Sequence, residues 1–329
     1  MTMNLDIREL DPALPETLPT LLPVHQAAIA VDSPRHPVPT EAWLRFTSGP
    51  RVTRHRMAVA AFDGGLPVGY GVLNHDKEGN QDLLYGDLWV MPERRGDVAG
   101  PLVEAFREYG RGRGCERLVL GFSEFAADDY EPVFVAGGAR LVEKERRSQL
   151  DLTTVDREQY AAWAAPSEKN AHYRIEAWTV PTPEHRLESL ILADEAMRDA
   201  PTGDLHLEHT KVSVDLRRSW EAMVVAAGQR EHLIVAVTED EEVAGFHGMF
   251  VIPGFAMADV GNTGVLPRFR GHGLGLRLKA AMTLRLLDSE PRLEAVSTWN
   301  DSGNEPMLRV NVAMGYTAAE SWSNWQFDL

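Results

Sequence analysis

The chain has 329 residues, of which 44% are hydrophobic and 25% charged, and this composition predicts two folded domains and excludes wholesale disorder. Its net charge of −16 and pI near 5.1 argue against nucleic acid as a partner, because duplex-binding proteins usually carry a basic face. The single cysteine, Cys115, excludes an internal disulfide and a cysteine zinc site, and its place before an apolar run predicts a buried, inert thiol.

The N-terminal segment Met1–Leu10 carries Asp6, Arg8 and Glu9 and lacks the apolar stretch of a secretory signal. No apolar run in the sequence approaches the length of a membrane span. We therefore expect a cytoplasmic protein with no membrane partner.

The first half of the chain predicts a strand, helical material, a hairpin and then a strand–turn–helix unit. The opening strand is expected over Asn4–Leu10, and Ala58–Ala61 pairs with Val68–Leu73 around a glycine turn at residues 63–65. The strand-like run Leu88–Pro92 is followed by Arg95–Gly100. A helix comes next, with one apolar face made by Leu102, Val103, Phe106 and Tyr109.

The second half predicts the same order of elements after a linker over residues 153–171, which holds one short helix ending before Pro166. A strand is expected over Tyr173–Ala177, followed by a helix with Thr182 as N-cap and Pro183 as its first residue. Leu233–Val237 and Val243–Phe250 form the predicted hairpin.

The two halves are related by a constant offset in the sequence. Val90 and Val265 are 175 residues apart, and so are Arg95 and Arg270. A repeat of this length indicates duplicated domains, here over residues 1–152 and 172–329, each with an α/β pattern.

The most informative segment is the turn Arg270-Gly271-His272-Gly273-Leu274-Gly275, which joins a strand to a helix. Glycines let the backbone approach a ligand, and the free N–H groups of the first helical turn favour an anion such as a diphosphate. The pattern is neither a Walker A loop, which needs Gly-Lys-Ser/Thr, nor a dinucleotide fingerprint, which needs glycine at Leu276.

This turn and the residues downstream of it resemble the GCN5-related N-acetyltransferases (GNAT superfamily), in a tandem arrangement. The matching residues follow the family's order and spacing over about the last third of the chain: Val265, Pro267, Arg270, Gly271, Gly273, Gly275, Asn304, Met307, Gly315 and Tyr316. The resemblance implies two tandem GNAT-like domains, each a mixed, mostly antiparallel twisted sheet flanked by helices. It also implies acyl transfer from acetyl-CoA to an amine, without a metal.

The resemblance further implies which residues contact the cofactor. The pantetheine arm of acetyl-CoA is expected along Thr263, Gly264 and Val265, and Asn304 is expected near it. The diphosphate is expected on the turn and the start of the helix, which are Arg270, Gly271, His272, Gly273, Leu274, Gly275 and Leu276.

The matching turn of the first half, Arg95–Gly100, differs in two ways. Val98 stands where the second half has Gly273, and a branched side chain there is expected to crowd a diphosphate. Asp97 replaces His272, and a like-charge contact at about 4 Å costs roughly 4 kcal/mol before screening. We expect the first domain to be structural, or a wall of the acceptor site, and not to bind CoA.

Two residues are the first candidates for proton transfer. Asp259 matches the position of a carboxylate base in some family members, and strand alternation without a bulge places it on one face with Gly261, Thr263 and Val265. Asn311 stands where many relatives have a tyrosine acid, and it donates a hydrogen bond but delivers no proton near neutrality. Three possibilities then remain for the leaving thiolate: a proton from Tyr316, a proton from water, or departure without an acid.

The acceptor is expected at the polar segment 199–209, where the family has a mobile loop. Its carboxylates Asp199, Asp204 and Glu208 are suited to attract a cationic amine. The histidines of this segment, His206 and His209, match no standard zinc spacing, so we expect no metal.

Taken together, the sequence predicts an N-acetyltransferase that moves an acetyl group to a small, cationic amine in a ternary complex. The alternatives left open are a non-catalytic acyl-CoA sensor or scaffold and an O-acyltransferase with the same cofactor site. The protein is expected to be a monomer with an internal pseudo-dimer, or a homodimer.

Overall fold

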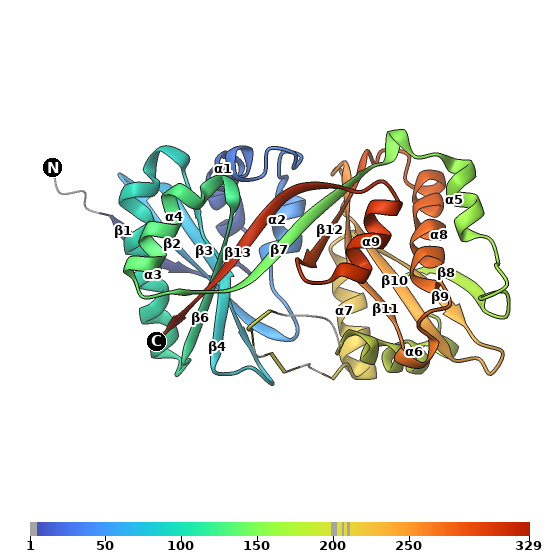
Figure 1. Ribbon diagram of the computed structural model, residues 1–329. Helices are drawn as coiled ribbons and strands as arrows, with labels where there is room; N and C mark the ends of the chain where they lie inside the picture. The colour runs from blue at the N-terminus through green and yellow to red at the C-terminus, as the bar shows by residue number, and fades with distance from the viewer. Residues whose placement is uncertain (1–4, 199–202, 206, 209–210) are drawn as a thin grey trace. The chain divides into compact units, whose positions relative to one another are not determined.

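The structure is a computed structural model that describes residues 5–198, 203–205, 207–208 and 211–329 (Figure 1). The chain divides into two compact units that exchange segments. Unit 1 contains residues 1–146, 202–210 and 319–329, and unit 2 contains residues 147–201 and 211–318. The predicted division of roles between residues 1–152 and 172–329 stays a prediction.

The sheet of unit 1 has the strand order β1-β2-β3-β4-β6-β13, with the short β5 also paired to β3. Most neighbours are antiparallel, and β4 and β6 are parallel. Its strands are β1 (Asp6–Leu10), β2 (Arg54–Asp63), β3 (Leu66–Asp76), β4 (Leu83–Asp87), β5 (Trp89–Val90), β6 (Arg117–Ser123) and β13 (Thr317–Asp328), and β7 (Arg140–Asp151) runs on into unit 2. The red strand β13 lies beside β6 in Figure 1.

Helices cover both faces of this sheet. They are α1 (Thr17–Asp32), α2 (Glu41–Ser48), α3 (Arg95–Gly112) and α4 (Ala127–Ala136). One core lies under α3, where Leu102, Val103 and Phe106 are buried as the helical spacing predicts. The other lies under α1 and contains Leu21, Val24 and Tyr70.

The sheet of unit 2 has the strand order β12-β11-β10-β9-β8. The strands are β8 (Arg174–Thr179), β9 (Arg230–Val237), β10 (Val243–Val251), β11 (Met257–Val265) and β12 (Ala295–Asp301). All neighbours are antiparallel except β11 and β12, which are parallel. The helices are α5 (Arg157–Ala164), α6 (Glu184–Ala193), α7 (Val214–Ala226), α8 (Leu274–Ser289) and α9 (Glu305–Ala313).

Two apolar cores define the faces of the unit 2 sheet. The first, under α8, contains Leu278, Met282 and Met249. The second, under α6 and α7, contains Leu190, Val224 and Phe246. The predicted fold class, with mixed and mostly antiparallel sheets flanked by helices in tandem, is confirmed.

The predicted strands and hairpins agree with the observed elements, but the start of α6 does not. The helix begins at Glu184 with Pro183 as its N-cap, so the expected cap at Thr182 is one residue too early. Thr182 is buried, and its hydroxyl and backbone N–H both donate to the carboxylate of Glu221 on α7. A tertiary contact therefore uses the side chain that the local pattern assigned to capping.

Candidate functional site

The glycine turn at residues 270–273 is an open loop between β11 and α8. A short 3-10 turn over Pro267–Phe269 is followed by Arg270 in an extended conformation. Gly271 has φ +84° and Gly273 has φ +76°, which is the left-handed region that other residues avoid. Because α8 begins at Leu274, its first unpaired N–H groups and positive dipole end face the loop. This geometry suits an anion.

Contacts from the segment before β8 hold this turn in place. The Tyr173 hydroxyl lies 2.7 Å from Nδ1 of His272, and the Asn170 amide donates to the His272 carbonyl at 3.1 Å. Arg277, in the second turn of α8, donates to the carbonyls of Asn170 at 2.7 Å and Tyr173 at 3.2 Å. Asn170, Tyr173 and Arg277 were not among the predicted site residues, because nothing in the local pattern links the segment around Asn170 to the turn, 102 residues further along the chain at His272.

Arg270 is oriented by the strand that precedes it. Its Nε donates to the Val265 carbonyl at 2.9 Å, and a terminal nitrogen lies 3.4 Å from the Ala196 carbonyl. The guanidinium is thus positioned beside the glycine turn by two backbone oxygens. Its expected contact with a diphosphate stays a prediction.

Strands β11 and β12 pair over only a short length and then separate. Their parallel register covers Met257–Asp259 against Ala295–Ser297, although β11 continues to Val265 and β12 to Asp301. Beyond Asp259 the two strands no longer pair, and we call this unpaired stretch the wedge. The predicted pantetheine-binding residues Thr263, Gly264 and Val265 lie on the β11 side of this wedge.

A β-bulge in β11 changes which residues share a face. His247 pairs with Thr263, but Met249 pairs with Val260, so β11 has one extra residue at Gly261–Asn262. The expected placement of Asp259 on one face with Thr263 and Val265 is therefore wrong. Asp259 pairs with Phe250, and paired residues share a face, so Asp259 lies on the α6–α7 side of the sheet.

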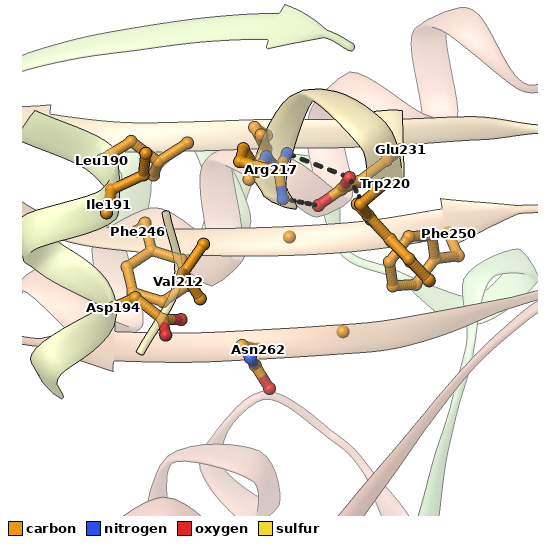
Figure 2. Close-up of a pocket in the computed structure, with 13 residues that line it drawn as sticks. Leu190, Ile191, Asp194, Val212, Arg217, Trp220, Glu231, Phe246, Phe250 and Asn262 are labelled. Atoms are coloured by element: carbon orange, nitrogen blue, oxygen red, sulfur yellow. Dashed lines mark hydrogen bonds and ion pairs between the residues drawn. The ribbon is translucent and has the colours of Figure 1, made fainter. Parts of the chain in front are cut away.

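A cavity of about 270 Å³ lies on that same side of the unit 2 sheet (Figure 2). Its walls come from α6, α7 and the middle strands. The lining residues are Leu190, Ile191, Asp194, Val212, Arg217, Trp220, Glu231, Leu233, Phe246, Gly248, Phe250, Gly261 and Asn262. The bulge residues of β11 thus line this cavity.

An ion pair with a buried carboxylate forms one wall of the cavity. Glu231 is 4% exposed, and Arg217 reaches both of its oxygens, at 3.2 and 3.0 Å. The indole Nε1 of Trp220 donates to the same carboxylate at 3.2 Å. Burial raises the pKa of Glu231, while Arg217 and Trp220 act to lower it. Asp194 and Asn262 lie apart from this pair in Figure 2.

Two of the three acidic residues of the predicted acceptor segment are among the described residues. Asp204 and Glu208 belong to unit 1, where the Asp204 N–H donates to the Val142 carbonyl at 2.8 Å and Glu208 exchanges two hydrogen bonds with Asn80. Neither lines the cavity of unit 2. Asp199, His206 and His209 lie outside the described residues. An acceptor role for Asp199, Asp204 and Glu208 stays a prediction.

Helix α9 presents two asparagines with different roles. Asn304 is its N-cap, and its Oδ1 accepts from the Met307 N–H at 3.3 Å. Asn311 is buried and makes two side-chain hydrogen bonds, to Lys279 and Asn300. Tyr316 is fully enclosed in the core under α8, and burial raises the pKa of its hydroxyl further above neutrality. This placement does not favour Tyr316 as a proton donor.

The residues of unit 1 that match the glycine turn do not form a turn. Residues 95–100 are the start of helix α3, which follows directly on a 3-10 turn over Pro92–Arg94. Val98 is fully buried in the core instead of facing an anion site. Arg95 is 3% exposed and forms an ion pair with Asp32. The expectation that Val98 crowds a diphosphate is therefore wrong, because the residues that match the turn form a helix and Val98 points into the core.

Three further observations concern metals, membranes and the thiol. Over the described residues, no group of three or more histidine, cysteine or acidic side chains is arranged to hold a metal ion. No helix among them is long and apolar enough to cross a membrane. Cys115 is buried as predicted, and burial raises its pKa.

Comparison with known proteins agrees with this architecture. Residues 193–316 match the model of the acetyltransferase (GNAT) family. Among solved structures, a tandem GNAT protein from the clavulanic acid biosynthesis pathway, without AcCoA, has a TM-score of 0.80 at 24% identity, over 99% of this chain and 98% of that one. No curated protein matches the chain.

Two other structures have the same fold at lower identity. A GCN5-related N-acetyltransferase from Sphaerobacter thermophilus has a TM-score of 0.70 at 15% identity, over 98% of this chain and 95% of that one. An acetyltransferase from the GNAT family from Colwellia psychrerythraea has a TM-score of 0.59 at 13% identity, over 98% of this chain and 100% of that one.

The fold is thus that of a tandem GNAT protein. Residues 193–316 match the GNAT acetyltransferase family, and this match supports acyl transfer in general as the chemistry. Proteins of this family generally use acetyl-CoA as cosubstrate.

Proposed function

We propose that the chain transfers an acetyl group from acetyl-CoA to the amine of a small, cationic acceptor, by direct attack in a ternary complex. The observation that supports this is the course of β11. Its bulge at Gly261–Asn262 lines the cavity, and its next residues, Thr263–Val265, lead to the glycine turn. A single strand thus connects an anion site to an acceptor-sized pocket.

The residues of the turn fit the cofactor. The diphosphate of acetyl-CoA would lie on the N–H groups at the start of α8, with Arg270 beside it and the left-handed Gly271 and Gly273 allowing close approach. The pantetheine arm would enter the wedge between β11 and β12, and Asn304 would stand beside it. When bound, acetyl-CoA supplies the activated acyl group.

The cavity fits a cationic amine with an apolar body. It has two carboxylates, Asp194 and Glu231, against one guanidinium, that of Arg217. Trp220 and Phe250 pack edge to face and offer aromatic surface on which a cation is favoured. We propose this cavity as an acceptor site in unit 2, and the acidic segment stays a separate prediction.

Asp259 is the proposed base. It lies on the cavity side of the sheet, next to Phe250 in the register, and is half-buried. An acceptor arrives as an ammonium ion and must lose a proton before its lone pair attacks the thioester carbonyl. A carboxylate on the cavity face is suited to take that proton, directly or through a water.

Two measurements test the proposal. Isothermal titration of acetyl-CoA is expected to show binding to the wild type and none to Gly273→Val, whose branched side chain would stand in the turn. Gly254→Val is the control, because Gly254 has φ +75° and lies in the turn after β10. A Cβ there would meet nothing within 4 Å, and one at Gly273 would be in ordinary contact with Nδ2 of Asn170 at 3.6 Å. Equal affinity in all three proteins, or none in the wild type, would contradict the cofactor site.

Thiol release from acetyl-CoA over a panel of amines and alcohols identifies the reaction. We expect release with small cationic amines. Release with alcohols alone would instead assign an O-acyltransferase. A second candidate function, a non-catalytic acyl-CoA sensor, is favoured by Asn311 in place of a tyrosine acid, and binding without release with any acceptor would establish it.

A further inference from the structure

A lysine is buried in unit 2 between helices α8 and α9. Lys279, on α8, is 1% exposed, and its Nζ donates to Oδ1 of Asn311 at 2.8 Å. The same Nζ lies 5.3 Å from the centre of the Tyr316 ring. Among the described residues no carboxylate forms an ion pair with it. A buried ammonium without a counterion is costly, so its presence needs a reason beyond packing.

Asn311 fixes the direction in which Lys279 points. Its Nδ2 donates to Oδ1 of Asn300 at 2.8 Å, and this contact turns its oxygen toward Lys279. Lysine only donates hydrogen bonds, so an asparagine oxygen held in this way is a matched partner for it. Asn300 lies on β12 beyond Ser297, where β12 no longer pairs with β11.

Lys279 also interacts with the other side of the wedge. Its charge acts on His247 of β10, whose Nδ1 lies 2.7 Å from the Thr263 hydroxyl on β11. Lys279 is thus connected to β12 by hydrogen bonds through Asn311 and Asn300. Its charge is also felt by His247, the residue that contacts Thr263 on β11.

From this geometry we propose that Lys279 is the acid that protonates the CoA sulfur as it leaves, with Asn311 as the residue that positions it. The inference rests on the proposed acetyl transfer. Residue 311 on α9 is not a tyrosine, and in this proposal the proton donor comes from the neighbouring helix α8.

The protonation balance of the step is simple. When the tetrahedral adduct collapses, the carbon–sulfur bond breaks and its electron pair goes to sulfur. Sulfur takes a proton from the Lys279 ammonium, and Lys279 becomes a neutral amine. The proton lost by the acceptor goes to Asp259 or through water to solvent, and Lys279 regains its own proton from solvent when CoA leaves.

The titration of Lys279 agrees with this role. Burial lowers its pKa to about 7, so at neutral pH it both holds and releases a proton. The titratable groups around it are His247 on β10, Tyr316 after α9 and Tyr160 on α5, next to Tyr316. Burial lowers the pKa of His247 and raises those of both tyrosines, so none of them titrates near neutrality in the folded protein.

The test compares the wild type with Lys279→Met and Asn311→Asp in thiol release against pH, with acetyl-CoA affinity measured for each protein. In the wild type kcat is expected to fall as pH rises through about 7, because the acid loses its proton. Lys279→Met is expected to lower kcat about 100-fold, to lose this alkaline limb and to keep its CoA affinity. Asn311→Asp places a carboxylate beside the ammonium and is expected to move the limb to higher pH.

The outcomes separate the two proposals. Thiol release by Lys279→Met at the wild-type rate, with an unchanged alkaline limb, would overturn the role of Lys279 and leave acetyl transfer standing. No thiol release by the wild type with any acceptor would overturn both. Should Lys279→Met fail to bind CoA, the limb of Asn311→Asp decides, and an unmoved limb counts against the proposal.

Discussion

Val98 packs directly against Gly69, with its Cγ1 only 2.9 Å from the place that a Cβ on residue 69 would take. In the first repeat the residue that matches Gly273 is therefore a part of the core. The helix α3 starts at Arg95 and carries Val98 inward, and Arg95 is itself held by Asp32. The two repeats differ in backbone conformation here, not only in side chains.

The contact predicts that Gly69→Ala destabilises unit 1. A methyl group there would also meet Leu102 at 2.9 Å and Val90 at 3.1 Å, and overpacking of this kind costs about 1–3 kcal/mol. The free energy of unfolding in urea measures this. Gly96→Ala is the control, because its Cβ would meet nothing within 4 Å, and we expect its stability to be unchanged or slightly higher. Equal stabilities would contradict the close packing.

The same contact predicts that restoring the glycine does not restore a site. Val98→Gly is expected to lose about 3 kcal/mol of stability through a cavity and a helical glycine. It is not expected to add acetyl-CoA binding, because residues 95–100 remain helical and Arg95 remains buried. Isothermal titration measures the number of sites, and a second site in Val98→Gly would show that Val98 alone closes the first unit.

Asp259→Asn tests the proposed base. We expect kcat/KM to fall by a factor on the order of 100 or more near neutral pH, with acetyl-CoA affinity unchanged, since the amide accepts no proton. The measurement is the pH–rate profile with the best amine. Asp288→Asn, at an exposed position on α8, should behave as the wild type. A profile for Asp259→Asn that matches the wild type removes this carboxylate from the mechanism.

Asp194→Asn tests the acceptor cavity. The half-buried carboxylate is expected to attract the cationic amine, so its loss should raise KM for that amine about tenfold, equivalent to roughly 1.4 kcal/mol, with a smaller effect on kcat. The neighbouring Glu195→Gln, which removes a partner of Arg198, is the control. The proposed cavity would be wrong if both variants changed KM equally.

Lys279→Met is expected to raise stability, in the opposite direction to its effect on turnover. Burial lowers the Lys279 pKa from 10.5 to about 7, so the unfolded chain binds this proton more tightly. The penalty is absent above pH 10.5, grows as pH falls, and is complete below about 7, where it is on the order of 5 kcal/mol. Urea unfolding at pH 6 and pH 9 measures it, and the gain of Lys279→Met should shrink at pH 9. A gain that does not depend on pH would mean that Lys279 is not titrating in this range.

Local patterns in the sequence were sufficient for the elements and for the glycine turn. The hairpins, the apolar face of α3 and the left-handed glycines Gly271 and Gly273 follow from spacing and backbone sterics. The side on which Asp259 lies did not follow, because a single bulged residue in β11 reverses the alternation. Arg95, at the start of α3, is paired with Asp32, 63 residues away, and no local pattern indicates this contact.

The cavity was also beyond local reasoning. Its ion pair joins Arg217 of α7 to Glu231 of β9, and other lining residues come from α6, β10 and β11. Each of these residues looks ordinary within its own segment. The burial of Lys279 could not be predicted locally either. A lysine in an amphipathic helix is normally solvated, and only the packing of α9 against α8 shows that this one is enclosed.

The exchange of segments between the two units bears on how the chain is made. Strand β13 completes the sheet of unit 1 beside β6, but it is synthesised almost two hundred residues later. The N-terminal unit therefore cannot finish folding while the rest is being translated. N-terminal domains generally fold first during synthesis, and this unit cannot do so completely. Until residues 319–329 arrive, β6 has an open edge, and the chain at that stage is exposed to mispairing with other nascent chains.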